Sequence, residues 1–442
     1  MSPAETTTDS IVIKLGIFAL RPNSPAVEEY DVKITCVGGG PAGLYFSLLM
    51  KLCEPKHAVT VLERNWVGPS HGWGVTLGRD LIDRLRDNDG ASARAVEKAG
   101  RRWTQQVVNV KGERIVQGGY DVYNIAREDL MSILADRARE LGVHVSYGHE
   151  VTDANELRPS DLIVIADGAR SRLRSAVGEF DTHVRFGADK YIWLGSSAPF
   201  DAFNYIFKAT DHGWVWAYVY QFDTQTSTVI VECSAKTWTS LGFASMPTDD
   251  CVGILTDLFA DQLNGHPLVA RLPDGTTATW LNFSTVTNQR WHSRNAVLLG
   301  DSAHTAHYSL GQGTKMALED AIVLADSLAR NADLEAALSK YEAQRKKELA
   351  RPLGEALCSA KWFECLPRYA ALNPHQFASL LESRWSPLVQ VLPPWVSYQL
   401  KQAAGRFPVL NDIRSRIGPA VKDRYARRKP ARGSNGQVRG LA

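Results

Sequence analysis

The sequence has few of the features that mark membrane, secreted or nucleic-acid-binding proteins. None of its apolar runs approaches the roughly 20 residues that a membrane-spanning helix needs. The early stretch Ile11–Leu20 follows two acidic residues and is interrupted by Lys14, so we do not expect a signal peptide. A net charge of only +2 gives no reason to expect nucleic acid as a partner. We therefore expect a cytoplasmic protein that binds neither membranes nor nucleic acid.

The sequence also lacks the cysteine spacings of metal sites and redox motifs. No Cys-x-x-Cys pair occurs, and no internal repeat is visible. We expect reduced thiols that serve in packing, with neither disulfides nor a bound metal. What is present is an ordinary globular composition, 44% hydrophobic and 22% charged among 442 residues, enough for two or three packed units. The six cysteines are Cys36, Cys53, Cys233, Cys251, Cys358 and Cys365.

A dinucleotide-binding signature lies near the start of the chain. Lys33–Val37 reads as a short buried strand, and the pattern Gly38-x-Gly40-x-x-Gly43 follows at once. Leucines at helical spacing begin at Leu44. Glycines in such a pattern allow a tight turn, close approach of the backbone to a pyrophosphate, and close packing of helix on strand.

An acidic strand end strengthens this signature. The apolar stretch AVTVLE ends in Glu63, twenty residues after Gly43. A carboxylate at this distance accepts hydrogen bonds from ribose hydroxyls. Arg64 follows and suits either a flavin or a nicotinamide dinucleotide. The pattern predicts a dinucleotide site and leaves FAD and NAD(P) open.

A second acidic strand end appears further along the chain. The stretch DLIVIADG ends in Asp167 and Gly168, and three arginines follow. The carboxylate can accept a hydrogen bond from a hydroxyl or a turn N–H, and the glycine permits close backbone approach. The alternative is an ordinary strand followed by a turn and then by basic residues that bind no ligand.

A third strand end combines an acid with a glycine-rich helix start. The apolar stretch NAVLLG leads to Asp301, at the carboxyl end of a strand, where ligands gather in open α/β sheets. Gly311, Gln312 and Gly313 then precede a helical pattern. Backbone amides at such a helix start can approach a flat, electron-rich ring and stabilise negative charge on it.

In this order, the motifs resemble those of the single-component FAD-dependent aromatic hydroxylases. Further stretches resemble the subgroup of salicylyl-CoA 5-hydroxylase and anthraniloyl-CoA monooxygenase, with the violacein-pathway tryptophan hydroxylase more distant. The likeness covers Val32 to Ile417. The stretches that carry the closer likeness include GWGV, KYIWLGSS, FDTQTSTVIVECS, AHTAHYSLGQGTKMALEDA, SAKWFECLPRY and SPLVQVLPP.

The resemblance implies an α/β fold with a Rossmann-like FAD-binding domain. As in para-hydroxybenzoate hydroxylase, an antiparallel β-sheet substrate domain would be inserted, and a helical segment would follow at the C-terminus. The expected division is an N-terminal extension (1–30), FAD-binding parts (31–175 and 286–340), the substrate sheet (176–285), C-terminal helices (341–420) and a basic disordered tail (421–442).

The resemblance also implies the reaction and its partners. FAD is the expected cofactor, NADH or NADPH the transient hydride donor, and O₂ the co-substrate. The enzyme would hydroxylate an electron-rich aromatic ring through a flavin C4a-hydroperoxide. The ring would be carried as an aryl-CoA or related thioester such as salicylyl-CoA. We expect a monomer or homodimer.

Three cofactor contacts are carried over from the resemblance. Arg127 stands where the family places an arginine that reaches the FAD pyrophosphate. Asp167 and Gly168 match the motif that contacts the pyrophosphate and is linked to NAD(P)H use. Asp301 matches the aspartate that binds the ribityl chain.

The substrate side is predicted from the loop after Asp301 and from an aromatic stripe. Most family members carry prolines after the first histidine of this loop, whereas here His307 and Tyr308 follow and are expected to face the reacting edge. His307 is the candidate base, because imidazole titrates near working pH, and a structural histidine is the alternative. His304 is a weaker candidate.

Residues 190–235 read as an antiparallel meander whose third strand carries alternating aromatic residues on one face. The stripe suits either a core or a pocket for a planar substrate, with Tyr218 or Trp216 as its lining. The aromatic residues are Trp214, Trp216, Tyr218, Tyr220 and Phe222.

Other readings stay open at the level of sequence. The cations Arg345, Lys346, Lys347 and Arg351 suit either the phosphates of CoA or a solvated helix face. The enzyme could instead hydroxylate a free tryptophan-like or other aromatic acid. A flavin-dependent halogenase would carry Trp-x-Trp-x-Ile-Pro, of which WVWAYV has the tryptophans alone. A flavin-binding module without turnover is the last alternative.

Overall fold

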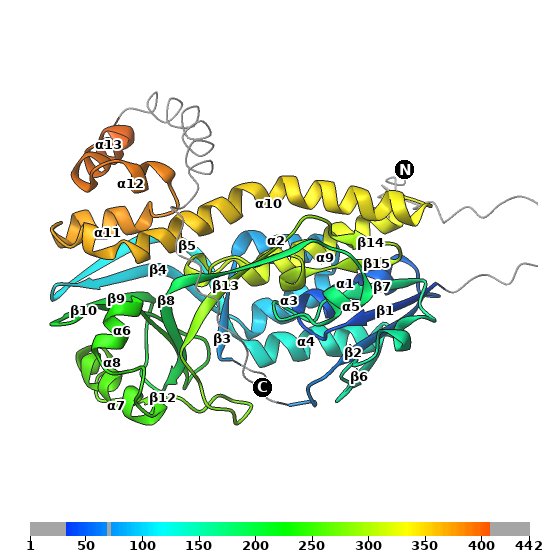
Figure 1. Cartoon of the computed structure of the whole chain (residues 1–442), viewed down its shortest axis with the longest axis horizontal. Coiled ribbons are helices and arrows are strands. Elements are labelled where there is room, and N and C mark those ends of the chain that lie inside the picture. Colours follow the sequence, from blue (N-terminus) through cyan, green and yellow to red (C-terminus); the bar gives the residue numbers. More distant parts are fainter. Residues whose placement is uncertain (1–31, 69–71, 407–442) are drawn as a thin grey trace, which may run out of the picture.

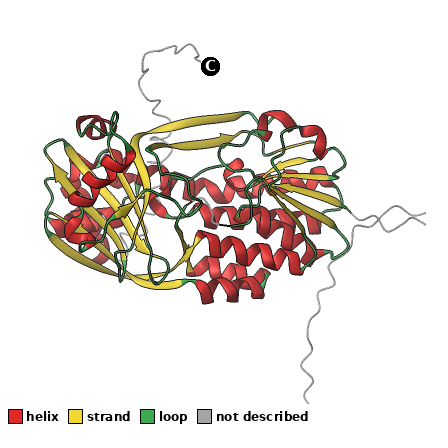
Figure 2. Cartoon of the chain, turned by 90° about the horizontal axis from the view of Figure 1, so that it is seen from below, coloured by secondary structure: helices red, strands yellow, loops and turns green. Residues whose placement is uncertain are grey.

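The computed structural model describes residues 32–68 and 72–406. Two β-sheets and the helices packed around them make up this part of the chain (Figure 1). Seen from below, helices gather between two groups of strands (Figure 2). The expected N-terminal extension and basic tail lie outside the described residues.

The first sheet has six strands and carries the dinucleotide signature. Its order is β14-β15-β7-β1-β2-β6, and all neighbours are parallel except the short pair β14 and β15. The strands expected before the glycine pattern and before Glu63 are confirmed. The bounds are β1 Lys33–Val37, β2 Ala58–Glu63, β6 His144–Tyr147, β7 Leu162–Ile165, β14 His292–Ser293 and β15 Ala296–Leu298.

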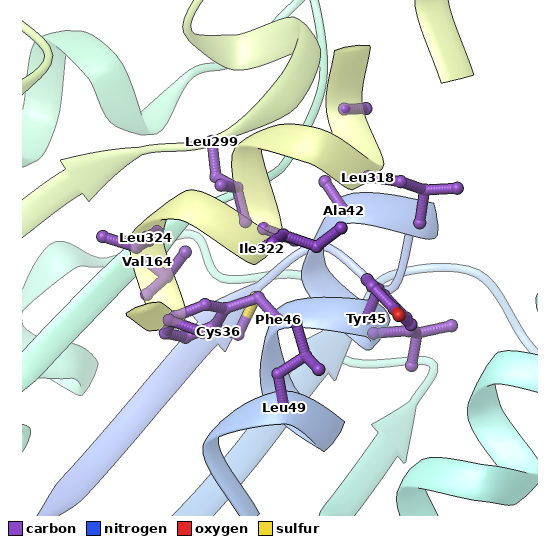
Figure 3. Close-up of a cluster of buried hydrophobic side chains, with 14 of the residues drawn as sticks. Cys36, Ala42, Tyr45, Phe46, Leu49, Val164, Leu299, Leu318, Ile322 and Leu324 are labelled. Carbon is purple, nitrogen blue, oxygen red and sulfur yellow. The ribbon is translucent and has the colours of Figure 1, made fainter. Parts of the chain in front are cut away.

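Helices cover this sheet and build the largest hydrophobic core. Pro41 occupies the first helical position of α1, where its missing N–H costs nothing. Figure 3 shows Ala42 and Phe46 of α1 beside Leu318 and Ile322 of α9 in this core. The bounds are α1 Pro41–Cys53, α2 Arg79–Asn88, α3 Gly90–Ala99, α4 Arg127–Glu140, α5 Leu173–Val177 and α9 Gly313–Arg330.

The second sheet has nine strands and is mainly antiparallel. The order is β12-β8-β11-β10-β9-β4-β5-β3, with β13 also paired to β8, and β4 runs parallel to β9. The four antiparallel strands predicted across residues 190–235 occur as β8 to β11, but the predicted meander is formed by β9, β10 and β11 alone. β8 pairs with β11 and not with β9, because the chain crosses over the intervening strands between β8 and β9. The bounds are β3 Gly74–Gly78, β4 Arg101–Val110, β5 Glu113–Ala126, β8 Thr182–Ser196, β9 Phe203–Thr210, β10 Gly213–Gln221, β11 Ser227–Cys233, β12 Leu268–Val269 and β13 Leu281–Asn288.

The second sheet recruits strands from both sides of the expected boundary at residue 175. β3, β4 and β5 precede that boundary but hydrogen-bond into this sheet. The expected division of the chain into domains therefore stays a proposal.

The remaining helices pack on the second sheet or follow it. The longest, α10, has 31 residues and runs along both halves of the molecule (Figure 1). The bounds are α6 Ala235–Ser240, α7 Thr248–Leu258, α8 Ala260–Leu263, α10 Leu334–Glu364, α11 Pro374–Glu382, α12 Pro387–Val391 and α13 Pro394–Arg406. The 3₁₀ helices are η1 Ala154–Leu157, η2 Gly300–Ser302, η3 Tyr308–Leu310 and η4 Leu366–Tyr369.

No disulfide joins any of the six cysteines, all of which lie in the described residues; four are buried and two are exposed. No helix within residues 32–68 and 72–406 combines the length and the apolar character that crossing a bilayer would require.

Candidate functional site

The predicted motifs meet at one edge of the first sheet. Gly38 follows β1, Glu63 ends β2, Asp167 follows β7 and Asp301 follows β15, and these four strands are immediate neighbours in the order β15-β7-β1-β2. Parallel strands place their carboxyl ends at the same edge. All four residues line one cavity of about 2370 Å³. Segments far apart in the chain thus converge on a single site.

The glycine pattern forms the turn between β1 and α1. Gly38 has a φ of +112°, and a Cβ there would lie 2.2 Å from the carbonyl oxygen of Ala166. A Cβ on Gly43 would lie 2.2 Å from the carbonyl oxygen of Gly38, so this glycine allows close packing of helix on strand. Gly40 lines the cavity, and a Cβ there would meet no atom within 4 Å. The space beside Gly40 is therefore open to a ligand.

Glu63 is fixed beside the glycine turn. Its Oε2 accepts a hydrogen bond of 2.7 Å from the Gly39 N–H, and its Oε1 accepts one of 2.8 Å from the Asn65 N–H. Both Glu63 and Arg64 line the cavity. Each carboxylate oxygen has further lone-pair capacity, which a hydroxyl donor can use.

Asp167 has an unused acceptor. Its Oδ1 is buried and has no hydrogen-bond partner among the described residues, and burial raises the pKa of the carboxyl. Gly168 lines the cavity beside it. Of the three arginines that follow, Arg174 turns inward and donates 2.8 Å to the Ser302 carbonyl, which joins this loop to the one after β15. A buried polar atom without a partner is rare, and it points to a ligand.

Arg127 and Asp301 line the same cavity. In the described part of the chain, the Arg127 guanidinium makes no hydrogen bond or ion pair. Burial lowers its pKa, while Asp301 and Glu63 favour its charged form. Burial raises the pKa of Asp301, against the influence of His304 and Arg127. A cation without a partner, close to carboxylates, suits a ligand with phosphates and hydroxyls.

His304 belongs to a buried network behind the site. Its Nε2 lies 2.8 Å from Oδ2 of Asp320, and Oδ1 of Asp320 accepts a bond of 2.7 Å from Arg345 Nε. Burial alone would raise the pKa of Asp320, but His304 and Arg345 hold it below its usual range. His304 therefore supports the loop and does not line the cavity.

This network contradicts both predicted roles of the basic run on α10 for one of its members, Arg345. Arg345 is 1% exposed, so it is neither a surface cation nor available to CoA phosphates. Lys346 pairs with Glu342, and Arg351 with Glu355, in the i to i+4 spacing of a solvated helix face.

The helix start after Asp301 also reaches the cavity. Gly311 and Gly313 line it, whereas Gln312, the N-cap of α9, does not. The first N–H groups of an α-helix have no intrahelical partner and carry a partial positive charge. The N-terminus of α9 thus offers donors to a ring bound beside Gly311 and Gly313.

The aromatic stripe divides between cavity and core. Tyr218 and Tyr220 line the cavity, together with Tyr308 from the loop after β15. Trp216 does not line it; its ring stacks on Phe363 of α10 at a centroid distance of 5.7 Å. Tyr218 and Tyr220 therefore line the cavity, whereas Trp216 belongs to the hydrophobic core.

His307 lies behind the cavity wall. Its Nδ1 accepts a hydrogen bond from the Ser309 N–H at 3.3 Å and lies 2.9 Å from the Ser309 hydroxyl. The ring stacks on Tyr308 at 4.3 Å and does not line the cavity. Burial, with a contribution from Arg384, lowers the pKa of His307 to about 3. This geometry does not support His307 as a base in direct contact with a substrate.

Sequence reasoning missed two groups at the site. Glu232 of β11 is buried, and its Oε2 accepts 2.7 Å from the Tyr218 hydroxyl. Arg384 lines the cavity from the end of α11 and donates 2.7 Å to the Tyr205 hydroxyl. Glu232 had a signal, an acid inside the apolar stretch VIVEC, whereas nothing around Arg384 marks it in the sequence.

The residues present suit FAD. An open glycine turn, a helix N-terminus, an unpartnered arginine and three carboxylates face one cavity in the arrangement that a dinucleotide needs. Aromatic side chains form the adjoining wall, which suits a planar substrate.

Comparisons with known proteins identify the family of this chain. The FAD binding domain family matches residues 30–353. A salicyloyl-CoA 5-hydroxylase of Streptomyces sp is 37% identical over 359 residues, covering 78% of this chain and 68% of the relative. A 3-hydroxy-4-methyl-anthranilyl-[aryl-carrier protein] 5-monooxygenase of Streptosporangium sibiricum is 32% identical over 339 residues, covering 76% of this chain and 90% of the relative.

Comparison with solved structures identifies the fold of the chain. The tetrameric form of 2-methyl-3-hydroxypyridine-5-carboxylic acid oxygenase has a TM-score of 0.64 at 20% identity, covering 78% of this chain and 93% of that one. The predicted family, fold class and FAD cofactor are therefore confirmed. The chain belongs to the FAD-binding-domain family and is an FAD-dependent aromatic monooxygenase.

Proposed function

We propose that this monooxygenase hydroxylates an electron-rich aromatic ring carried as a CoA or related thioester, such as salicylyl-CoA. The names of both relatives describe an aryl group attached to a carrier, either CoA or a protein. The cavity carries the proposal: at about 2370 Å³ it exceeds the roughly 300–1,000 Å³ of a pocket for one small ligand. It has room for a dinucleotide, a ring and the start of a carrier arm.

In this proposal the chain holds FAD through the groups that line the first sheet. Arg127 and the α1 N-terminus bind the pyrophosphate, Glu63 the adenosine ribose and Asp301 the ribityl chain. The amides at Gly311 and Gly313 contact the ring system. The bound cofactor, supplied with hydride from NADH or NADPH and with O₂, provides the electrophilic oxygen atom.

The remaining residues prepare the substrate. Tyr218 and Tyr308 line the cavity, where they orient an aromatic ring and keep water from it. Tyr191 stands 4.8 Å from Tyr308, centroid to centroid, and extends the same wall. His307 acts in this proposal from behind Tyr308, as a neutral neighbour of the wall.

The proposal is tested with the purified holoenzyme and a panel of aryl substrates. Salicylyl-CoA, anthraniloyl-CoA and the matching free acids are each incubated with NADH or NADPH and O₂. We expect thioesters to stimulate oxidation of the nicotinamide, with hydroxylated product matching the nicotinamide consumed. Hydroxylation of the free acids alone would overturn the thioester proposal.

A free aromatic acid is the second candidate, and one observation favours it. Arg384 lines the cavity, and no ion pair joins it to a carboxylate in the described residues. Its hydrogen bonds go instead to neutral oxygens, those of Tyr205, Ser309, Ser359 and Leu381. An uncompensated guanidinium at the substrate end attracts a carboxylate. The substrate panel above separates the two candidates.

A further inference from the structure

Glu232 is a buried carboxyl directly behind the aromatic wall. In β11 it pairs with Trp216 of β10 on one side and with Tyr191 of β8 on the other, so the three side chains share one face of the sheet. Only 2% of Glu232 is exposed. Charged residues are almost never buried to this extent unless they are paired.

The contacts of Glu232 lead to the cavity. Its Oε2 accepts hydrogen bonds from the Tyr218 hydroxyl at 2.7 Å and from Trp216 Nε1 at 3.1 Å. The Tyr308 side chain also interacts with the carboxyl and favours its charged form. Tyr218 and Tyr308 line the cavity, whereas Glu232 does not. One hydrogen bond therefore separates the carboxyl from a group that a substrate can touch.

The charges around Glu232 do not neutralise it. Asp189, two residues before Tyr191 on β8, lies diagonally across the same face, and its Oδ2 has no partner in the described chain. His307 Nε2 stands 3.9 Å from Oε1 of Glu232, but its low pKa leaves the ring neutral. Cys233 and Tyr191 complete the titratable groups nearby. Arg384 acts on His307 and Tyr205 rather than on this carboxyl.

These surroundings set the protonation of the carboxyl. Burial, followed by repulsion from Asp189, raises the pKa of Glu232 to about 8. The same desolvation, with Glu364 nearby, raises the pKa of Asp189 to about 7. A group with such a pKa exchanges protons near neutral pH, which is where a general base is most effective.

We propose that Glu232 receives, through Tyr218, the proton that the substrate releases from its ring hydroxyl. This inference rests on the proposed function. The substrate O–H bond breaks as its proton bonds to the Tyr218 oxygen, and the Tyr218 O–H bond breaks as that proton bonds to the Glu232 carboxylate. No electrons are transferred between molecules, so the step is not a redox reaction. After it, the negative charge has moved from Glu232 to the ring oxygen. The ring becomes more electron-rich at the positions that an electrophilic oxygen attacks.

Glu232 fits this role better than His307. The His307 Nδ1 is engaged by Ser309, and the ring lies outside the cavity lining. Glu232 is instead bonded to a tyrosine that lines the cavity. Because it acts through Tyr218, Glu232 is a positioning residue rather than a catalytic one.

The test compares wild type with Glu232→Gln and Tyr218→Phe across pH 6 to 10, as holoenzymes with salicylyl-CoA. For wild type we expect kcat for hydroxylated product to rise as Glu232 ionises and to level off above its pKa. Both variants lose this rise, so above pH 8 their kcat falls by about 100-fold, the scale of general-base catalysis. KM and FAD content stay unchanged, as a merely structural loss would not allow. Glu113→Gln, an exposed acid on β5, is the matched control.

The possible results distinguish failure of the relay from failure of the proposed function. Variants that keep the wild-type pH profile of kcat overturn the relay and leave the proposed function standing. A wild type that forms no product from any substrate of the panel overturns the proposed function, and the relay with it. Should Glu232→Gln fail to retain FAD, Tyr218→Phe decides, because it removes one hydroxyl and keeps the ring that packs on Phe363.

Discussion

Gly38 and Gly40 stand two residues apart in the same turn, but their surroundings differ. A Cβ at Gly38 would collide with the backbone at Ala166, and its φ of +112° disfavours any other residue. A Cβ at Gly40 would enter open space on the cavity side, with an ordinary φ of −72°. One glycine serves the fold and the other serves the ligand.

Substitution separates these two roles. We predict that Gly40→Ala keeps the thermal stability of the apoprotein but weakens FAD binding by at least about tenfold, or about 1.4 kcal/mol. The added methyl group takes space beside the expected pyrophosphate. Gly38→Ala should lower apoprotein stability as well. Calorimetry and FAD titration measure both effects, and Gly253→Ala in α7, where a Cβ meets nothing, is the control. Unchanged FAD affinity in Gly40→Ala would contradict the assignment.

At the residue scale, the sequence located the acidic strand ends that line the cavity, but it did not locate Glu232 or Arg384. Glu63, Asp167 and Asp301 follow strands, and strand ends are readable from apolar runs. Glu232 and Arg384 act through partners that are distant in sequence, such as Tyr218 and Tyr205. Local pattern carries no information about such pairs.

Helix α10 is tied to α9 by a buried ion pair. Arg345 Nε donates 2.7 Å to Asp320 of α9, and neither side chain is exposed by more than 2%. Asp320 Oδ2 also accepts from the Gly300 N–H at 3.2 Å, directly before Asp301. The pair therefore positions the loop that carries Asp301.

Breaking this pair should be costly. We predict that Arg345→Met lowers the free energy of unfolding by about 3–5 kcal/mol, because it leaves Asp320 buried with less compensation. Arg330→Met removes an exposed pair with Asp326 and should cost no more than about 0.5 kcal/mol. Urea unfolding of both variants provides the comparison. Equal losses would show that burial does not set the strength of the pair.

At the scale of elements, the sequence predicted which segments form strands better than it predicted which sheet each strand joins. The strands from Lys33, from Ala58 and across 190–235 occur as expected. The sequence does not assign β4 and β5 to the second sheet. β5 joins this sheet by pairing with β4, and β4 joins it through a parallel pairing with β9, about a hundred residues further along the chain. Pairing over such a distance depends on packing, which periodicity does not report.

The two halves of the molecule share elements. Tyr341 of α10 packs in the core of the first sheet, and Trp362 at the other end of the same helix packs in a core of the second. A helix of 31 residues spans about 46 Å, at roughly 1.5 Å per residue. Neither half can lose its packing without disturbing α10.

We predict that the halves unfold together. On heating, release of FAD and loss of far-ultraviolet circular dichroism should coincide, since residues from both sheets line the cavity proposed to hold FAD. FAD in 100-fold excess over its Kd should stabilise the whole protein by about 2.7 kcal/mol. Two separate transitions, with FAD leaving before the second sheet melts, would contradict this coupling.

The strands β7 and β15 are neighbours in the first sheet, but they are translated at different times. Leu162 to Ile165 are made more than a hundred residues before Ala296 to Leu298, which complete the same edge of the sheet. A ribosome-bound chain that ends before Asp301 thus contains the loops that follow β1, β2 and β7 but lacks the loop that follows β15. Capture of the coenzyme must wait until about two thirds of the polypeptide has been translated, and earlier truncation products should emerge colourless.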